Sequence, residues 1–520
     1  MLTGGCGRPH PPFFSLGAPS RSRAPWLLAA CLLAGSPASA SPPAEDLAAK
    51  AQRGKEAMAA GRFDQAAAVY AEIVQLLPSE PGMLLNLGMA LSMAGRPREA
   101  IPHLQAALKL RPELIPASLF LGSAHLELGQ ASRAVEPLQM VVAAQPDNRD
   151  ARQMLADALL SLQRYEPATR HFGRLSELAP REPRVLYGLG RSYEGLAREA
   201  FEGLQRSAPD SPYLLLLVAE AMAAQGKGAN AFRLYREALE KRPGLPEAHE
   251  AVARIYEQTG QPEWAARERE KSRGIPPLDC RSPSLECAFR AGRYSAVLAA
   301  AAPVASPEGR YWLSRTAGEL ARDAFARLGD LPPSPEAMLL RVEVFRARRQ
   351  PPGEMIEELK GAVAAWPEDL RIRRELATLL VHVHNEEAAR PLLEDLLKRE
   401  PDSAELSLML GQTFLQTQEA AKAVPLLARA VKLDPKLLPA QAALGRAHLE
   451  IGEAAQAIPH LEAALPTDTD GSIHYQLARA YRSTGQTDLA SQALSKFQEI
   501  QRSAESEARS LKEEFRITPP

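Results

Sequence analysis

Prolines spaced 34 residues apart run through most of this 520-residue chain. The spacing holds from Pro78 to Pro180, from Pro209 to Pro277 and from Pro333 to Pro435. Longer stretches recur as well, since "LKLRPELIPASLFLGSAHLELGQ" returns later in the chain as "VKLDPKLLPAQAALGRAHLEIGE". An enzyme pocket needs its side chains in one place, whereas a repeated unit gains stability by stacking on neighbouring copies. The chain is therefore predicted to be a repeat protein.

Each repeat has the pattern of two helices joined by a tight turn. We number each repeat so that its proline is residue 32. In most repeats the residue at position 8 is then small, the residue at position 20 is alanine, and the residue at position 24 is large and apolar or aromatic. Positions 4, 7, 8 and 11 share one helix face and positions 20, 24 and 27 share another, so small side chains let the two helices approach closely. Glycine marks the turn, because it adopts the left-handed conformation that ends a helix. The turn glycines are Gly61, Gly95, Gly129, Gly226, Gly260, Gly452 and Gly485.

The repeat is helical throughout, and no run of residues alternates at period two. We therefore expect an all-α protein from about Glu45 to Arg502. About eleven blocks in register, among them "NLGMALSMAGRPREAIPHLQAALKLRP" (Asn86–Pro112), resemble the tetratricopeptide repeat family. The resemblance implies a right-handed superhelical solenoid of antiparallel helix pairs. It also implies that protein or peptide partners bind along the concave groove lined by the first helices of the repeats.

The 34-residue proline spacing is interrupted at two places, and the sequences at these two places are similar. The proline step is 29 residues from Pro180 to Pro209 and 56 residues from Pro277 to Pro333. "GLAREAFEGL" at the first defect reappears 124 residues later as "ELARDAFARL", and the same offset relates the neighbouring prolines. We expect one longer or kinked helix to replace the helix pair in each copy. The alternative is an ordinary short repeat with an unusual turn.

These breaks give a division of the chain into five parts. The parts are a leader at residues 1–40, an N-terminal repeat array at 41–277 with one shortened repeat near 181–209, an irregular helical segment at 278–335, a C-terminal array at 336–500, and a polar capping tail at 501–520.

Two cysteines, Cys280 and Cys287, stand in the irregular segment. On one continuous helix their α-carbons would be roughly 10 Å apart, too far for a disulfide. Ser282 is a suitable N-cap and Pro283 suits a first helical position, so Cys280 can lie in the preceding loop and fold back toward Cys287. We expect a disulfide between them; the alternative is a pair of unpaired thiols.

The N-terminus has the features of a secretory signal. Arg21 and Arg23 precede an apolar run, Ala24–Gly35, that is too short to span a bilayer, and Ala38-Ser39-Ala40 suits signal peptidase. Cleavage after Ala40 predicts an exported protein, either periplasmic or secreted, so the whole resembles an exported bacterial multi-repeat tetratricopeptide protein. The alternative is a lipoprotein signal, in which Cys31 carries the lipid and anchors the protein to the cell envelope.

No sequence motif indicates catalysis. The chain has no phosphate-binding loop, no nucleophile elbow and no paired-histidine metal motif, and we expect no catalytic, cofactor or metal site. A formal net charge of -1, with 62 basic and 63 acidic residues, argues against nucleic acid as a partner. The favoured function is a non-enzymatic scaffold for protein or peptide partners. The alternative is a solenoid enzyme, or a glycan-binding or polysaccharide-export factor, with its site near the irregular segment.

Positions 2, 5, 9 and 12 of each first helix point away from the packing face, and by resemblance they line the groove. They predict an acidic stretch in the middle of the chain and a basic stretch toward the C-terminus. The acidic stretch consists of Glu247, Glu250, Arg254 and Glu257. The candidate partner-binding residues of the basic stretch are Arg371, Arg374, Arg446, Tyr475, Arg479 and Arg482. Such a site would bind acidic groups, with the tyrosine as an aromatic anchor. The alternative is a merely solvated surface.

The carboxylate clamp of the tetratricopeptide family is reproduced only in part. Lys55 and Asn86 match it, but position 5 of the neighbouring repeats holds Ala51, Leu85 and Leu119. A partner held by its C-terminal carboxylate is therefore not expected from this array.

Overall fold

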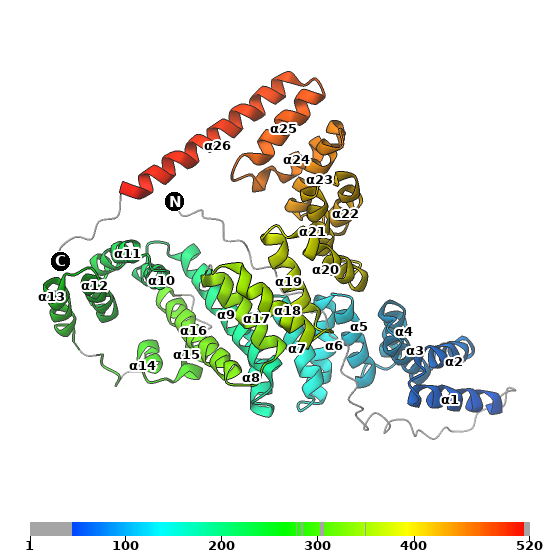
Figure 1. The fold of residues 1–520 in the computed structure, drawn as a ribbon. Helices are drawn as coiled ribbons and strands as arrows, with labels where there is room; N and C mark the ends of the chain where they lie inside the picture. The colour runs from blue at the N-terminus through cyan, green and yellow to red at the C-terminus, as the bar shows by residue number, and fades with distance from the viewer. Residues whose placement is uncertain (1–43, 277, 282–283, 302–305, 349, 514–520) are drawn as a thin grey trace. The chain divides into compact units, whose positions relative to one another are not determined.

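The computed structural model describes residues 44–513 apart from 277, 282–283, 302–305 and 349, and gives the backbone alone at 44–46 and 504–513. Within these ranges the chain forms 26 α-helices and one 3-10 helix, with no strand (Figure 1). The expected all-α class is confirmed. The expected leader at 1–40, including Cys31, lies outside the described residues.

The first nine helices form four helix pairs followed by a single long helix. They are α1 (Ala44–Ala59), α2 (Phe63–Leu76), α3 (Pro81–Met93), α4 (Pro97–Leu110), α5 (Ile115–Glu127), α6 (Ala131–Ala144), α7 (Arg149–Ser161), α8 (Tyr165–Leu178) and α9 (Pro183–Ser207). The second helix of each pair also packs against the first helix of the next pair. Stacking is therefore continuous from α1 to α9.

The remaining helices include two regular stretches and one irregular stretch. The first regular stretch is α10 (Pro212–Ala224), α11 (Gly228–Lys241), α12 (Pro246–Gln258) and α13 (Pro262–Arg273). The irregular stretch is α14 (Leu285–Arg290), α15 (Tyr294–Ala301) and α16 (Pro307–Gly329). The second regular stretch is α17 (Pro335–Arg348), α18 (Pro352–Ala365), α19 (Leu370–His382), α20 (Glu386–Arg399), α21 (Ala404–Gln416), α22 (Ala420–Leu433), α23 (Leu438–Glu450), α24 (Ala454–Ala464), η1 (Leu465–Thr467), α25 (Ser472–Ser483) and α26 (Thr487–Glu513).

Close helix packing explains the small residues at position 8. A Cβ atom placed on Gly88 would lie 2.5 Å from Cγ of Leu104, which stands at position 24 and is fully buried. Gly122 and Leu138 repeat the arrangement in the next pair. Each of these two repeats thus buries a leucine against a bare backbone, and a side chain at position 8 would have to displace it.

The turn between the helices contains a left-handed residue in most of the regular repeats. The turn glycines have positive φ, for example +74° at Gly95. In three repeats a residue with a side chain takes this place, namely Gln163 (φ 56°), His384 (φ 56°) and Gln418 (φ 61°). These three repeats keep the turn in spite of the steric cost of a side chain in this conformation. The repeat packing on both sides therefore determines the turn.

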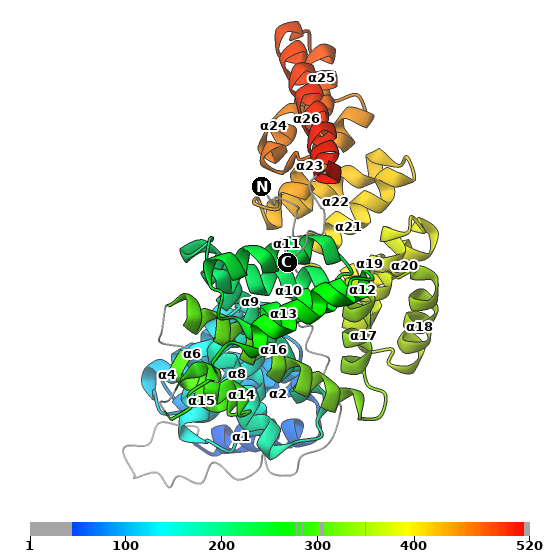
Figure 2. The same ribbon diagram turned by 90° about the vertical axis from the view of Figure 1, so that its left-hand side faces the viewer.

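The chain divides into two compact units, residues 1–207 with 279–337 and residues 208–278 with 338–520. The first unit is completed by α16, which packs along α9 as both ribbon views show (Figures 1 and 2). Both helices are continuous, with 25 residues in α9 and 23 in α16. The expectation of one longer helix at each break in the rhythm is therefore confirmed.

Helices α9 and α16 run antiparallel. Arg310, near the start of α16, donates hydrogen bonds to the carbonyl of Gly203 and the hydroxyl of Ser207 at the end of α9. Ser314 donates to the carbonyl of Ala197 at 3.0 Å. Phe325, near the end of α16, fills the space left by a glycine, because a Cβ on Gly190 would lie 2.3 Å from its ring. Each long helix thus takes the place of the second helix that the other lacks.

The 124-residue offset seen in the sequence also relates the helices. Helix α18 repeats α11 and α19 repeats α12 with the same residue offset at both ends, and α16 begins 124 residues after α9. This pairing also changes the expected division of the chain. The boundaries near 277 and 335 separate stretches of sequence, but residues 208–278 belong to the same compact unit as the C-terminal array. At the other end, α26 continues past residue 500 to Glu513, into the expected tail.

Candidate binding surfaces

The first helices of successive repeats form the inner row of each array. In the C-terminal array α19, α21, α23 and α25 contact one another in that order, and in the N-terminal array α3, α5, α7 and α9 do the same. Ion pairs cross this row: Asp157 of α7 binds Arg184 of α9 at 2.6 Å, and Arg374 of α19 lies 3.6 Å from Glu405 of α21. These residues stand at positions 2, 5 and 9, so the positions expected to line the groove do share one face.

Two of the candidate arginines are matched by carboxylates of the chain itself. Asp369 caps the start of α19 through the backbone N–H groups of Arg371 and Ile372, and it binds the Arg371 guanidinium at 2.6 Å. Arg374 binds Glu400 as well as Glu405. The two arginine side chains are only 17% and 15% exposed. Little of their charge is left for a partner.

The acidic stretch is compensated in the same way. Glu250 and Glu257 of α12 both accept hydrogen bonds from Arg269 of α13, at 3.3 Å and 2.5 Å. The hydrogen bond from Arg269 lowers the pKa of the Glu257 carboxyl below its ordinary value. The alternation of acidic and basic groove charge expected from the sequence is thus largely neutralised within each array.

Tyr475, Arg479 and Arg482 differ from the other candidates. All three are exposed on α25, at a spacing of four and then three residues that places them on one helix face. Within the described part of the chain, neither Arg479 nor Arg482 has a hydrogen-bond or ion-pair partner. The Tyr475 ring is 5.6 Å from that of Phe497 in α26, and 48% of the residue remains exposed. These three residues form the basic stripe of the C-terminal array.

The start of α25 is fixed by a buried carboxylate. Asp468 accepts hydrogen bonds from the backbone N–H groups of Ile473 (3.1 Å) and His474 (3.0 Å), and the intervening Gly471 has φ +79°. Free N–H groups at a helix start are stabilised by such an acceptor. This cap fixes the first turn of α25, the helix that carries the basic stripe.

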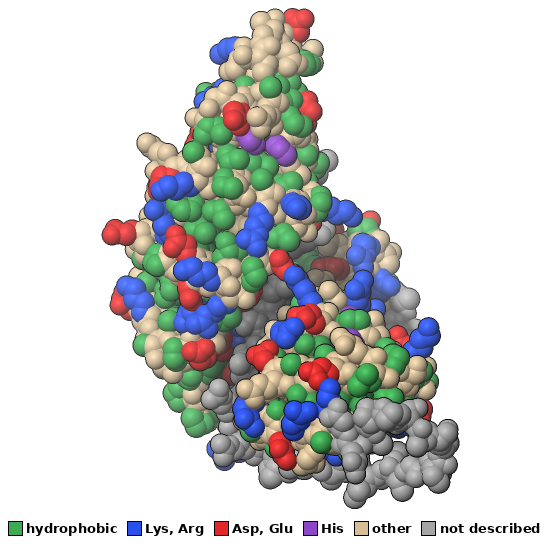
Figure 3. Space-filling view, turned by 90° about the vertical axis from the view of Figure 1, so that its right-hand side faces the viewer, with side chains coloured by type: hydrophobic (Ala, Val, Ile, Leu, Met, Phe, Trp, Pro, Cys, Tyr) green, Lys and Arg blue, Asp and Glu red, His purple; other side chains and the backbone are tan. Residues whose placement is uncertain are grey.

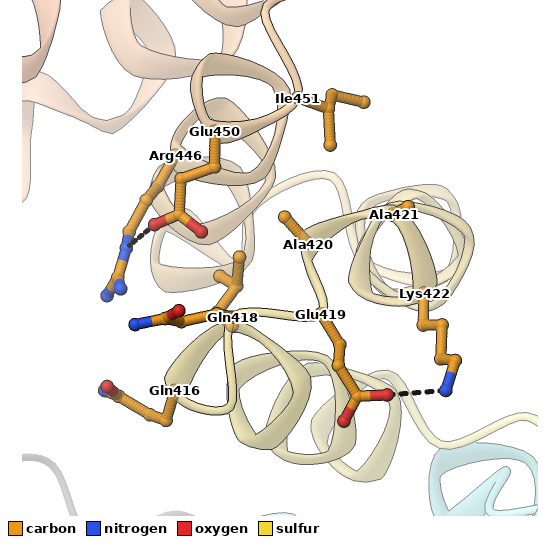
Figure 4. A pocket seen from close by; sticks show the side chains of 10 residues that line it. Gln416, Gln418, Glu419, Ala420, Ala421, Lys422, Arg446, Glu450 and Ile451 are labelled. Atoms are coloured by element: carbon orange, nitrogen blue, oxygen red, sulfur yellow. Dashed lines mark hydrogen bonds and ion pairs between the residues drawn. The ribbon is translucent and has the colours of Figure 1, made fainter.

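Arg446 lines a shallow cavity of about 750 Å³ in the C-terminal array (Figure 4). The cavity lies between the α21–α22 turn and the end of α23, and Arg446 binds Glu450 at 2.7 Å on one side of it. On the other side, hydrogen bonds from Lys422 and Thr417 lower the pKa of Glu419 to about 2. The lining residues are Leu415, Gln416, Gln418, Glu419, Ala420, Ala421, Lys422, Arg446, Glu450 and Ile451.

Gln416 and Gln418 were missed by the sequence analysis as lining residues. A signal was present for Gln418, because it replaces the turn glycine of most other repeats. Figure 4 shows both amide groups on the side of the cavity that Arg446 faces. A glutamine carboxamide can donate hydrogen bonds to the carbonyl groups of a peptide backbone and accept hydrogen bonds from its N–H groups.

The cysteine pair lies at the start of the irregular stretch. The sulfur atoms of Cys280 and Cys287 are 2.07 Å apart, and Cys280 lies in the loop before α14, as expected. The helix begins later than expected, at Leu285, with Ser284 as its N-cap accepting from the N–H of Cys287 at 3.1 Å. The residues expected to start it, 282 and 283, lie outside the described residues.

Metal, membrane and nucleic-acid features were also sought among the described residues. No group of three or more histidine, cysteine or acidic side chains there is arranged to hold a metal ion. None of the helices in this part is both long and apolar enough to cross a membrane. On the face drawn in Figure 3, basic and acidic side chains are interspersed over each array rather than gathered by sign.

Comparison with known families identifies the repeat. Models described as tetratricopeptide repeat match residues 51–115, 91–148, 195–246 and 374–437, and one described as bacterial transcriptional activator domain matches residues 406–516. The protein is a tetratricopeptide-repeat protein with an α-solenoid fold of paired helices.

Similar proteins match only parts of the chain. The Hsp70-Hsp90 organizing protein of Triticum aestivum is 33% identical over 106 residues, which are 20% of this chain and 18% of that protein. BBSome complex member BBS4 of Bos taurus is 26% identical over 191 residues, 36% of this chain and 37% of that protein. The chain thus spans well under half the length of these relatives. Among solved structures, MamA from Desulfovibrio magneticus RS-1 is 18% identical with a TM-score of 0.22, covering 38% of this chain and 94% of MamA.

Proposed function

We propose that the protein is a non-enzymatic, exported scaffold that binds protein or peptide partners on the concave face of its repeats. The repeat architecture supports this, as do relatives named for organising two chaperones and for membership of a complex. Nothing in the described residues favours the alternative of an enzyme or glycan-binding factor centred on residues 278–335.

The basic stripe is the proposed contact for an acidic partner. The observation that carries this assignment is that Arg479 and Arg482 lack carboxylate partners in the described residues, whereas Arg371, Arg374 and Arg446 have them. An arginine already paired must give up one partner to gain another, while an unpaired one gains a charge-assisted hydrogen bond outright. An exposed tyrosine beside it supplies apolar contact at low entropic cost.

A partner would approach the stripe along the inner row. Its acidic side chains would meet the two free arginines on α25, and its backbone would continue toward the cavity beside Arg446. There, the amides of Gln416 and Gln418 can hydrogen-bond an extended chain. The stripe and cavity together describe an elongated site for a peptide rather than an enclosed pocket for a small molecule.

Charge reversal on the stripe tests the proposal. The mature protein is used to capture partners from an envelope extract, and affinity for the recovered partner is then measured at two salt concentrations. Arg479→Glu with Arg482→Glu should weaken binding more than about tenfold and reduce its dependence on salt. The matched control is Arg267→Glu with Arg273→Glu, two exposed arginines of α13. Unchanged affinity in a stripe variant of unchanged melting temperature would assign these arginines to a solvated surface.

Export is proposed from the leader and the cysteine pair. An oxidising compartment preserves a disulfide between Cys280 and Cys287, whose sulfurs are already at bonding distance. Mass spectrometry of the protein from a periplasmic or culture fraction distinguishes the two expected termini. A mature chain beginning at Ser41 supports ordinary cleavage, a lipid-modified Cys31 supports an envelope anchor, and an intact N-terminus in the cytosolic fraction contradicts export.

A further inference from the structure

The inner helices α3 and α5 of the N-terminal array carry almost no charge. Neither contains a lysine or an arginine, and their only carboxylate is Glu127 at the end of α5. Helix α19 differs, because it contains three arginines, whereas α10 and α21 each carry a single glutamate and no lysine or arginine. Surface helices usually cover their solvent-facing side with charged residues. The low charge of α3 and α5 is therefore typical of a helix surface that contacts a partner.

Apolar side chains are accessible on this inner row. Met89 and Met93 stand at positions 9 and 13 of α3, one helical turn apart on the groove face, and Met93 is 40% exposed. Phe120 and Leu126 on α5 are half-buried. Methionine is flexible and polarisable, so such a surface adapts to apolar partners of varied shape. Accessible apolar side chains that share one face in this way are a feature of interaction sites.

Glu127 is the charged group beside this apolar strip. It stands at position 13 of α5, and the described residues provide it with one hydrogen bond, from Ser123 at 3.2 Å, and no cation. Crowding by neighbouring side chains raises the pKa of its carboxyl above the ordinary value, although the residue as a whole stays accessible. On the next inner helix, α7, Asp157 is instead buried and paired with Arg184. Glu127 is thus an accessible hydrogen-bond acceptor with no cation beside it among the described residues, on the same inner row as the apolar side chains.

We propose that the concave face over α3 and α5 binds an apolar segment of a partner protein that carries a lysine or arginine, with the cation pairing to Glu127. The methionines and Phe120 would cover the apolar side chains, and the cation would restore the charge balance that Glu127 lacks. A partner bearing an acidic residue at the same place would be rejected by like-charge repulsion. This groove therefore selects the opposite charge from that selected by the basic stripe, and it is a separate site on the chain.

Synthetic peptides of matched apolar sequence test the proposal directly. Three fluorescently labelled peptides of leucine, methionine and serine differ only at one central residue, which is lysine, norleucine or glutamate. Anisotropy titration with the full chain should show the lysine peptide binding about tenfold more tightly than the glutamate peptide. The norleucine peptide should lie between them. In Glu127→Gln, the difference between the lysine and glutamate peptides should fall below about threefold.

Controls separate the groove from nonspecific attraction. Glu113→Gln removes an exposed carboxylate from the loop before α5 and should leave the preference unchanged. Met89→Ser with Met93→Ser should weaken all three peptides alike, because it removes apolar contact without changing charge. Arg479→Glu with Arg482→Glu should have no effect, so failure of this inference is distinguishable from failure of the basic stripe.

Two outcomes would overturn the inference. One is equal affinity for the lysine and glutamate peptides, or a lysine preference that survives Glu127→Gln in a folded variant. The other is binding that appears only when residues 1–40 are removed. That result would assign the groove to the chain's own leader, which also combines arginines with an apolar run.

Discussion

Helices α10–α13 and α17–α20 are two copies of the same four helices, and they end differently. Helix α20 packs against α21, so the second copy continues into three more repeats. It buries Leu393 and Leu396, and the residues 124 positions earlier in α13 are Arg269 and Ser272. The outer face of α13 is polar and exposed. A few apolar-to-charged differences in the second helix are thus enough to change a stacking surface into a terminal cap.

The same comparison shows how groove charge is controlled. Glu250 in the first copy corresponds to Arg374 in the second, so the two grooves begin with opposite charges. Each charge is then cancelled locally, by Arg269 in one copy and by Glu400 and Glu405 in the other. A charged residue at a groove position therefore indicates a binding site only when its neighbours leave it unpaired.

Removing a buried carboxylate from the first copy should have the largest effect on stability. Glu268, fully buried in α13, binds His249 and Lys271 at 2.7 Å each, whereas the second copy has a leucine at this position. Glu268→Ala leaves Lys271 and Arg236 without this carboxylate and His249 without its hydrogen-bond partner, and we expect the free energy of unfolding to fall by about 3 kcal/mol. Urea unfolding followed through Trp264, which packs on a neighbouring tyrosine, measures the change.

The control for this change is Glu263→Ala, at an exposed position of the same helix. It should alter stability by less than about 0.5 kcal/mol. A loss below about 1 kcal/mol for the buried glutamate would mean that the charged network does not stabilise the end of the first array.

Breaking the cysteine pair should have the next largest effect, on the segment before α14, which lies between the two copies. The residues 124 positions earlier are Ala156 and Gln163, and the closed loop from Cys280 to Cys287 is short. By loop entropy, Cys280→Ser with Cys287→Ser should lower the stability of this segment by about 2–3 kcal/mol. Trp312 of α16 reports it, because its ring lies 5.1 Å from that of Phe289 in α14. Two alkylated thiols in unreduced exported protein would contradict the bridge.

A histidine of the N-terminal array should add a pH dependence that its counterpart 124 residues later lacks. Burial, with help from Arg152 and Arg170, lowers the pKa of His171 in α8 to about 4, and the corresponding residue in α15 is Ser295. As pH falls from about 6.5 to about 4, the unfolded chain binds a proton that the folded chain does not, so stability falls. After allowance for partial exposure, the loss is about 1–2 kcal/mol.

His171→Gln should flatten this part of the stability profile while leaving stability above pH 7 little changed. Urea unfolding at pH 7.5 and pH 4.5 gives the comparison. An equal loss in both proteins would show that other groups cause the acid sensitivity.

The smallest effect is expected at the turn between the helices. His384 adopts φ 56° in the second copy, where the first copy has Gly260 at φ +76°. His384→Gly relieves the steric cost of a side chain in the left-handed region and should stabilise the second copy by about 0.5–1 kcal/mol. Gly260→Ala should destabilise the first copy by about 1 kcal/mol. Thermal melting of the two variants compares them, and shifts in the same direction would contradict the shared turn geometry.

The repeat unit and its helices were predictable because they depend on local pattern. Alanine at position 20, a small residue at position 8 and the periodic prolines define helix ends and faces within each block. The longer helices were also predictable, because the apolar run crosses the usual turn. The turns at Gln163, His384 and Gln418 could not be predicted, because these residues replace the glycine that marks the turn elsewhere. Packing of the flanking helices holds them in a backbone conformation that they disfavour.

The candidate site was predictable only as a set of positions. The sequence placed Arg371, Arg374, Arg479 and Arg482 on one groove face. Nothing in their spacing shows which of them are free to bind a partner. The ranking depends on acceptors brought in by other helices, such as Glu400 from α20 and Glu405 from α21. On the N-terminal array, the absence of charge from α3 and α5 was visible in the sequence but was not recognised as a feature of the groove.

The sequence by itself therefore determined the helical repeat and its glycine turns, because these follow from residues within about one repeat length of one another. It also showed the duplication, because the two copies align residue by residue at an offset of 124. The tertiary structure decided which helices complete each other and which charges remain free. Helix α9 pairs with α16 across the intervening residues 208–306, and this pairing follows from shape, with Phe325 filling the space beside Gly190. An ion pair likewise forms only when folding brings its two side chains within a few ångströms, so the unpaired arginines of α25 could be found only in the folded chain.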